Sequence, residues 1–259
     1  MITLLNGEEW QEADILKRME DDSFYYGHLG QYALSSSSLK KLLQSPRAYQ
    51  ASLRQSDSSQ ALRDGQLVHM SILEKHKLKD LVIIEGTKAR KEYKEAVVEY
   101  GEHRVFTESE VNNAYWIADA VHSNQEAMYL LSDCDYEIPG IAMVEGIAHR
   151  AKADALTKDK KVIIDIKTTS SDIADFKWSA KKFNYGLQAA LYLHIFQAEE
   201  FIFLVVQKDT KDIGIFTCTE EFLSYGYADV LAGIQTYKNF FLQSNSDELI
   251  KNNVIRGIL

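Results

Sequence analysis

The order of the segments after about Ser132 most constrains the fold of this chain. Three strand-like runs separated by short turns come first, then one helical run, then two more strand-like runs. Strands joined by short turns pair as neighbours, and a helix between strands crosses over a sheet. The order therefore predicts an α/β (α+β) fold, a central mixed β-sheet flanked by helices. The runs, in chain order, are 136–143, 146–156, 161–169, the helical 183–200, 201–207 and 214–219.

The chain before this sheet is expected to be helical. Serines precede an amphipathic run that meets a proline at Pro46, where the helix must yield. We therefore expect one domain over residues 1–259, with a helical layer at 34–131 and a β-sheet core at 132–259. The helical segments expected outside the core sheet are 35–53, 59–76, 109–131 and a last helix at about 221–240.

Composition limits the class of protein. The two cysteines suggest a reducing compartment and exclude a four-cysteine zinc or iron–sulfur site made by this chain alone. The start lacks a signal-peptide pattern, and no apolar run reaches the roughly 18 residues of a membrane span. We expect a cytoplasmic protein without a membrane partner.

Charge is unevenly distributed. The net charge is −9, yet residues 150–182 hold nine Lys or Arg against five Asp. This basic island stands in an otherwise acidic chain, and it is either a solvated face or a surface for an anionic partner.

One Asp-x-Lys tripeptide lies inside an apolar strand. Asp165 and Lys167 follow three apolar residues, whereas the other Asp-x-Lys tripeptides lack such an apolar run. Side chains alternate across a strand, so Asp165 and Lys167 share one face. Asp154, eleven residues earlier, can reach Asp165 across a hairpin. Two close carboxylates repel, and a divalent cation with oxygen ligands resolves that conflict, which suits metal-assisted phosphodiester hydrolysis. The competing interpretation is a plain salt bridge of Lys167 with Asp154 or Asp165.

Three further residues are candidates. His69 lies on an apolar helix face, where a histidine is more often a core residue than a ligand. Gly65, one turn earlier, would allow close approach of another element. Gln188 and Tyr192 are four residues apart and share a helix face, which alone indicates core packing.

Taken together, these residues resemble the PD-(D/E)XK nuclease superfamily. The array is Gly65-x-x-x-His69, Asp154, Asp165-x-Lys167 and Gln188-x-x-x-Tyr192, in that order. It is most similar to the branch of RecE-type exonucleases (exodeoxyribonuclease VIII) and phage recombination exonucleases, with a RecB-like, restriction-endonuclease-like core. "LSSSSLKKLLQSPRAYQ", "HRAKADAL" and "VIIDIKTTSSDIADFKWSAKKFNYGLQAALY" carry the resemblance.

The resemblance implies a role for each matched residue. Asp154, Asp165, Lys167, Gln188 and Tyr192 would form the catalytic set, with Lys167 positioning the attacking water. The ligands of Mg²⁺ or Mn²⁺ would be His69, Asp154, Asp165 and the Ile166 carbonyl. Glu137 fits a family acidic position, although Glu145 competes for it. Ala153 stands where the family often has proline. The expected DNA contacts are Arg150, Lys152, Thr168, Lys181 and Lys182, and Trp178 either packs against a DNA end or is buried.

The implied function is a metal-dependent exodeoxyribonuclease on ends of linear double-stranded DNA. Digestion from 5′ to 3′ would leave 3′ strands for a RecT-type single-strand annealing protein, in a bacterial or phage-infected cell, and a homo-oligomeric ring would make it processive. Two alternatives remain: a PD-(D/E)XK endonuclease, and a catalytically silent DNA-binding or scaffold protein on the same fold.

Overall fold

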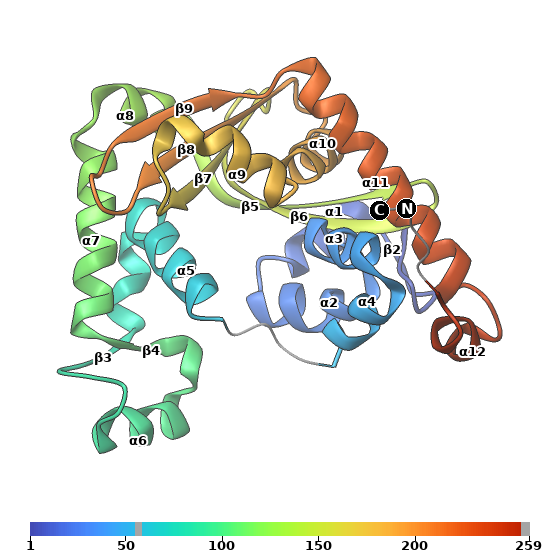
Figure 1. The fold of residues 1–259 in the computed structure, drawn as a ribbon, viewed down its shortest axis with the longest axis horizontal. Coiled ribbons are helices and arrows are strands. Elements are labelled where there is room, and N and C mark those ends of the chain that lie inside the picture. Colours follow the sequence, from blue (N-terminus) through green and yellow to red (C-terminus); the bar gives the residue numbers. More distant parts are fainter. Residues whose placement is uncertain (55–58, 255–259) are drawn as a thin grey trace.

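A five-stranded sheet forms the centre of the computed structural model (Figure 1), which describes residues 1–54 and 59–254. The strand order is β5-β6-β7-β8-β9. Within this sheet the β7–β8 pair is parallel and the other three pairs are antiparallel, so the predicted mixed sheet is confirmed. The predicted single domain also includes residues 55–58 and 255–259, which lie outside the described part. The strands are β5 (Cys134–Val144), β6 (Ile147–Thr157), β7 (Val162–Thr169), β8 (Glu200–Gln207) and β9 (Ile213–Thr217).

The parallel β7–β8 pair explains the helices that cover one face. Parallel neighbours need a crossover, and here α9 (Phe176–Lys182) and α10 (Tyr185–Phe196) provide it. The predicted helix at 183–200 is shorter in the structure. Gln197 adopts a left-handed conformation, which ends α10.

Side chains of β7 point alternately into two cores. Ile164 and Ile166 pack with α5 (Gln60–Leu73) and α7 (Glu108–Ser123). Ile163 packs on the other face, with apolar residues of α9 and α10. A helical layer thus covers each face of the central strand, and Asp165 and Lys167 lie on the α10 side, the face of Ile163.

Local capping sets the helix boundaries in the helical layer. The Ser45 side chain accepts from Ala48 N–H and starts α4 (Pro46–Ser52) directly after α3 (Ser36–Gln44), which confirms the predicted break at Pro46. The predicted continuous helix at 109–131 is wrong. Asn124 separates α7 from α8 (Gln125–Leu131) by accepting from Ala127 N–H at 2.9 Å.

Several elements were not predicted. The expected helical layer also contains a short parallel sheet. Apolar residues of the N-terminal segment, residues 1–33, pack against β5 and β6. No helix among the described residues combines the length and apolar character that a membrane crossing requires. These elements are β1 (Ile2–Thr3), β2 (Glu9–Trp10), α1 (Glu12–Arg18), the π-helical turn η1 (Ser23–His28), α2 (Leu29–Tyr32), β3 (Val82–Ile84), α6 (Lys91–Tyr100), β4 (Val105–Thr107) and α12 (Ser246–Lys251).

The long helix α11 (Glu220–Phe241) packs against α10 through two glycines. A Cβ atom added to Gly226 would lie 2.0 Å from the Gly186 carbonyl oxygen. Because the obstacle is backbone, no side-chain rotation relieves it. Gly226 therefore sets how closely the two helices approach.

We expect Gly226→Ala to lower the free energy of unfolding by about 1–3 kcal/mol, since α10 and α11 must separate. Gly65→Ala is the matched control, because a Cβ there meets nothing within 4 Å. The close approach expected at Gly65 is thus wrong for this chain, and alanine should stabilise α5 by roughly 0.5–1 kcal/mol. Equal effects of the two substitutions in denaturant unfolding would contradict the role of Gly226 in helix packing.

His149 is a fully buried histidine on β6, with 0% of its surface exposed. Its Nδ1 donates to the Ile147 carbonyl oxygen at 2.8 Å, and Nε2 has no hydrogen-bond partner among the described residues. Burial lowers the pKa of His149 to about 4. The ring is therefore neutral in the folded protein near pH 7.

Acid should destabilise the fold through His149. The unfolded chain takes up a proton near pH 6.5, while the folded protein does not until about pH 4. Stability is then lost as pH falls through this window, by up to about 3 kcal/mol. The difference in the free energy of unfolding between pH 7 and pH 5 should be smaller for His149→Asn than for the wild type. The exposed-site control His103→Asn should keep the full difference, and an unchanged difference in His149→Asn would refute the assignment.

Candidate active site

Asp165 and Lys167 lie side by side on the central strand. Asp165 is 1% exposed, and its Oδ2 is in ion-pair contact with the Lys167 ammonium. Gln188 on α10 donates from Nε2 to Asp165 Oδ1 at 2.6 Å. The carboxylate is therefore held from two sides, by its own strand and by the crossover helix.

Asp154 lies where the ladder between β6 and β7 ends. The last backbone pair before this point joins Ala155 to Ile164. One step further, the Ile166 N–H donates to Asp154 Oδ2 at 2.7 Å, so a side chain replaces the backbone acceptor. The predicted hairpin thus brings Asp154 and Asp165 to neighbouring positions on adjacent strands.

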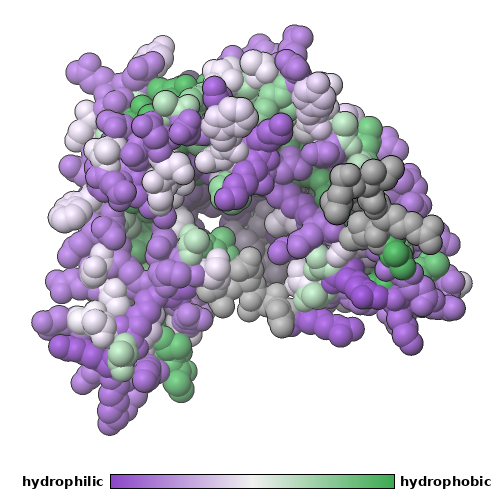
Figure 2. Space-filling view, viewed as in Figure 1, coloured by the Kyte–Doolittle hydropathy of each residue, from purple (hydrophilic) through white to green (hydrophobic). Residues whose placement is uncertain are grey.

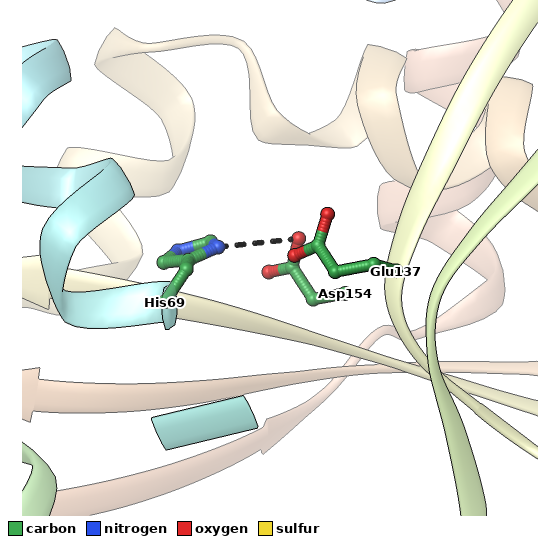
Figure 3. Close-up of side chains that lie close together, drawn as sticks. All are labelled: His69, Glu137 and Asp154. Atoms are coloured by element: carbon green, nitrogen blue, oxygen red, sulfur yellow. Dashed lines mark ion pairs between the residues drawn. The ribbon is translucent and has the colours of Figure 1, made fainter. Parts of the chain in front are cut away.

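His69 points from α5 toward Asp154 (Figure 3). Its Nδ1 lies 3.4 Å from Asp154 Oδ1, and its Nε2 lies 2.9 Å from the Ile166 carbonyl oxygen. Burial alone would lower the pKa of His69, but the Asp154 carboxylate outweighs it and raises the pKa to about 9. The same interaction holds the pKa of Asp154 below its usual range against burial. His69 is thus a cation in the metal-free protein.

Glu137 joins this group from β5 (Figure 3). Glu137 stands opposite Asp154, because its neighbours on β5 pair with the residues on either side of Asp154 in β6. Its φ of 53° is left-handed, which is uncommon for a residue with a side chain. Burial, followed by the charge of Asp154, raises the pKa of Glu137 to about 7. The competing Glu145 lies in the β5–β6 turn, 3.8 Å from Lys238. The structure therefore brings Glu137, not Glu145, to the site.

The site has the donor set of a hard divalent cation. One ligand atom from each of His69, Glu137 and Asp154 lies within 4.8 Å of the others. Two oxygen donors with one imidazole suit Mg²⁺ or Mn²⁺. Burial and then the charge of Asp154 raise the pKa of Glu137, and a bound cation would offset both. These residues fit such an ion. The implied ligand roles of Asp165 and the Ile166 carbonyl stay predictions, because both contact other residues here.

The pKa values of both Asp165 and Lys167 are raised. Burial, with the charge of Asp154 in addition, raises the pKa of Asp165. Burial opposes the charge on Lys167, but the two aspartates outweigh it and raise the pKa of Lys167. Lys167 is therefore an ammonium at neutral pH, able to donate to water or to a phosphate oxygen.

Two further predicted residues, Tyr192 and Thr168, lie on opposite faces of the sheet. Tyr192 packs against Phe196 and Phe201 on the face of the sheet below Asp165. Burial raises the pKa of its hydroxyl well above 10. Thr168 is half-buried on β7 next to Lys167. Tyr192 is therefore a neutral supporting side chain.

The cations predicted to contact DNA fall into two groups. Arg150 donates from Nε to the Leu29 carbonyl oxygen at 3.1 Å, and Lys152 pairs with Asp22 at 2.6 Å. Both therefore tie the N-terminal segment to β6. Lys181 and Lys182 are exposed at the end of α9. Their contacts with DNA stay predictions.

Exposed aromatic side chains accompany the second group. Trp178 on α9 is 59% exposed, so the alternative that it is buried is wrong. Phe183 follows α9 and is 52% exposed. The end of α9 therefore presents rings and ammonium groups together.

Two residues at the site were not predicted from the sequence. Tyr185 lies three residues before Gln188, so a helical-face argument extended by one turn would have found it. Its ring centroid is 5.2 Å from the Lys167 Nζ and 5.2 Å from the Nζ of Lys40 on α3. No signal in the local sequence distinguishes Lys40 from its neighbour Lys41.

Comparisons with known proteins found one matching family and several similar structures. A family model described as a PDDEXK-like domain of unknown function (DUF3799) matches residues 35–247. A crystal structure of a candidate exonuclease from Eubacterium rectale is similar, with a TM-score of 0.62 and 16% identity over 92% of this chain and 95% of that one. A phage-related exonuclease from Haemophilus somnus matches at 16% identity and a TM-score of 0.34, over 80% of this chain and 94% of that one. No curated protein matches.

The family match spans most of the chain and includes every residue of the site. The similarity to the Eubacterium rectale structure shows the same fold at an identity too low to transfer an activity. On the family match, this chain belongs to the family of PDDEXK-like domains of unknown function.

Proposed function

We propose that this protein is a divalent-metal-dependent exodeoxyribonuclease that hydrolyses linear double-stranded DNA from its ends. One observation carries the proposal: three separate elements, α5, β6 and β7, bring His69, Asp154, Asp165 and Lys167 into one polar group. A silent DNA-binding module has no physical need for buried carboxylates beside a cation.

The side chains divide the chemistry of hydrolysis between them. His69, Glu137 and Asp154 would hold the ion, which when bound would polarise the phosphate and favour deprotonation of a nearby water. The Lys167 ammonium would orient that water or donate to the phosphate oxygens as negative charge builds. Gln188 fixes Asp165, and through it the position of Lys167.

The shape of the molecule supports a DNA substrate. A hollow lies between α5 and the helices α2–α4, beneath the β5–β6 hairpin (Figures 1 and 2). His69 reaches the site from α5, which borders this hollow. From α9, Lys182 lies 5.5 Å from the Phe183 ring, which is 5.8 Å from the Tyr185 ring. A basic and aromatic path therefore leads from the exposed end of α9 to the site.

The finer assignments belong to the same proposal. The name of the Eubacterium rectale relative supports an exonuclease rather than an endonuclease. Polarity from 5′ to 3′, 3′ strands for a RecT-type annealing protein, and a homo-oligomeric ring rest on the resemblance of the sequence motifs. Substrates labelled at the 5′ or the 3′ end, together with covalently closed circles, separate the alternatives of polarity and of exonuclease against endonuclease.

Activity should depend on the pair in β7. Linear double-stranded DNA should be degraded with Mg²⁺ or Mn²⁺ and not with EDTA. Asp165→Asn and Lys167→Met should each reduce the rate by about 100-fold or more, because each removes a group that acts on the reacting phosphate or water.

The chain supplies its own matched control for this experiment. Asp159 and Lys161 form the same Asp-x-Lys spacing in a turn, where Asp159 accepts from Thr157 and Lys161 pairs with Glu199 at 3.1 Å. Asp159→Asn and Lys161→Met should leave the rate unchanged. Metal-independent cleavage, or equal losses at both tripeptides, would overturn the proposal. DNA binding without cleavage would favour the silent module.

Metal binding should be visible as stabilisation without DNA. Because the pKa of Glu137 is raised from 4.5 to about 7 by folding, the folded state loses stability as the pH rises between these values, and the full cost is present at pH 8. Glu137→Gln should therefore raise the metal-free melting temperature at pH 8. It should also reduce the further rise that Mn²⁺ produces in the wild type, since a bound ion stabilises only the folded state. An unaltered Mn²⁺ response in thermal scans would remove Glu137 from the metal site.

A further inference from the structure

Lys40 is a cation near the site that feels the charge of Asp165 but does not contact it. It is half-buried on α3, and among the described residues its ammonium forms no ion pair and no hydrogen bond. Its contact is with the face of Tyr185, 5.2 Å from the ring centroid. The other cations of the site differ, because Lys167 contacts Asp165 and His69 contacts Asp154.

The surroundings of Lys40 disfavour an uncompensated positive charge. Burial, followed by repulsion from Lys167, lowers the pKa of Lys40 to about 8. A half-buried ammonium beside a second ammonium is stabilised by an anion that contacts both. Lys40 and Lys167 each lie 5.2 Å from the centroid of the same Tyr185 ring, so an anion bound at Lys40 would be close to the reacting groups of the site.

The identity of the anion follows from the two ends of this arrangement. One end is the catalytic Lys167, and the other continues through Phe183 to Lys182 on the exposed end of α9. A small free anion would use only the Lys40–Lys167 end. A polyanion that runs along this path while its reacting phosphate lies at the carboxylates uses all of it.

We infer that Lys40 and the face of Tyr185 form a phosphate-binding position that holds the backbone phosphate of the DNA strand next to the bond being cut. This inference rests on the proposed function. The position aligns the strand with Asp165 and Lys167 without taking part in bond breakage. It also makes α3 part of the substrate site.

Lys40→Met tests the position, with Lys41→Met as the matched control, since Lys41 is exposed on the next position of the same helix. Binding of a fluorescent duplex is measured by anisotropy with Ca²⁺ in place of Mg²⁺, at several salt concentrations. Lys40→Met should weaken binding about tenfold and reduce the slope of log K against log salt by about one. Lys40→Arg should restore both. In turnover experiments KM should rise while kcat stays nearly constant, because the contact is equal in the ground and transition states.

Four results distinguish failure of the position from failure of the function. If the wild type cuts DNA and Lys40→Met behaves like Lys41→Met, the phosphate position is wrong and the nuclease stands. A lower melting temperature with an unchanged salt slope would assign Lys40 a structural role and overturn the inference. A loss confined to 5′-phosphorylated ends, absent with 5′-hydroxyl ends, would overturn a backbone phosphate in favour of a terminal one. If the wild type neither binds nor cuts, both proposals fail.

Discussion

The hydrogen bond from Ile166 N–H to the Asp154 carboxylate is the interaction on which the site depends. It stands where the β6–β7 ladder ends, so it satisfies a buried donor that would otherwise lack a partner. The other oxygen of Asp154 faces His69, whose second nitrogen faces the Ile166 carbonyl. One carboxylate therefore ends a sheet ladder, fixes the approach of α5 and lies within the group that fits a metal ion. Structure and chemistry are inseparable at this position.

The central strand and its hairpin could be predicted from the sequence because the relevant forces are local. Alternation placed Asp165 and Lys167 on one face, and the spacing to Asp154 matched the hairpin. Gln188 and His69 were different. Each alone indicated core packing, and only the resemblance of the ordered motifs assigned them to the site, where Gln188 does contact Asp165.

What the sequence did not predict depends on contacts between distant segments. The left-handed conformation of Glu137 is one example, because its residue type gives no sign of it. Lys40 reaches Tyr185 only because α3 packs beside α10, and the identical neighbour Lys41 does not. The break at Asn124 was readable in principle, since asparagine is a favoured N-cap, but the apolar periodicity on both sides concealed it.

The backbone contact of Gly186 with Gly226 fixes the distance between α10 and α11. Gln188 and Tyr185 are carried by the same helix, so the reach of the Gln188 amide to Asp165 is set by a backbone-to-backbone distance. Side chains adjust to small errors by rotating, whereas two backbones in contact cannot. The position of α11 therefore limits how far the site geometry can shift, although α11 contributes no side chain to the group around Asp165 among the described residues. A substitution in α11 that displaces α10 would therefore move the Gln188 amide and change the orientation of the Asp165 carboxylate.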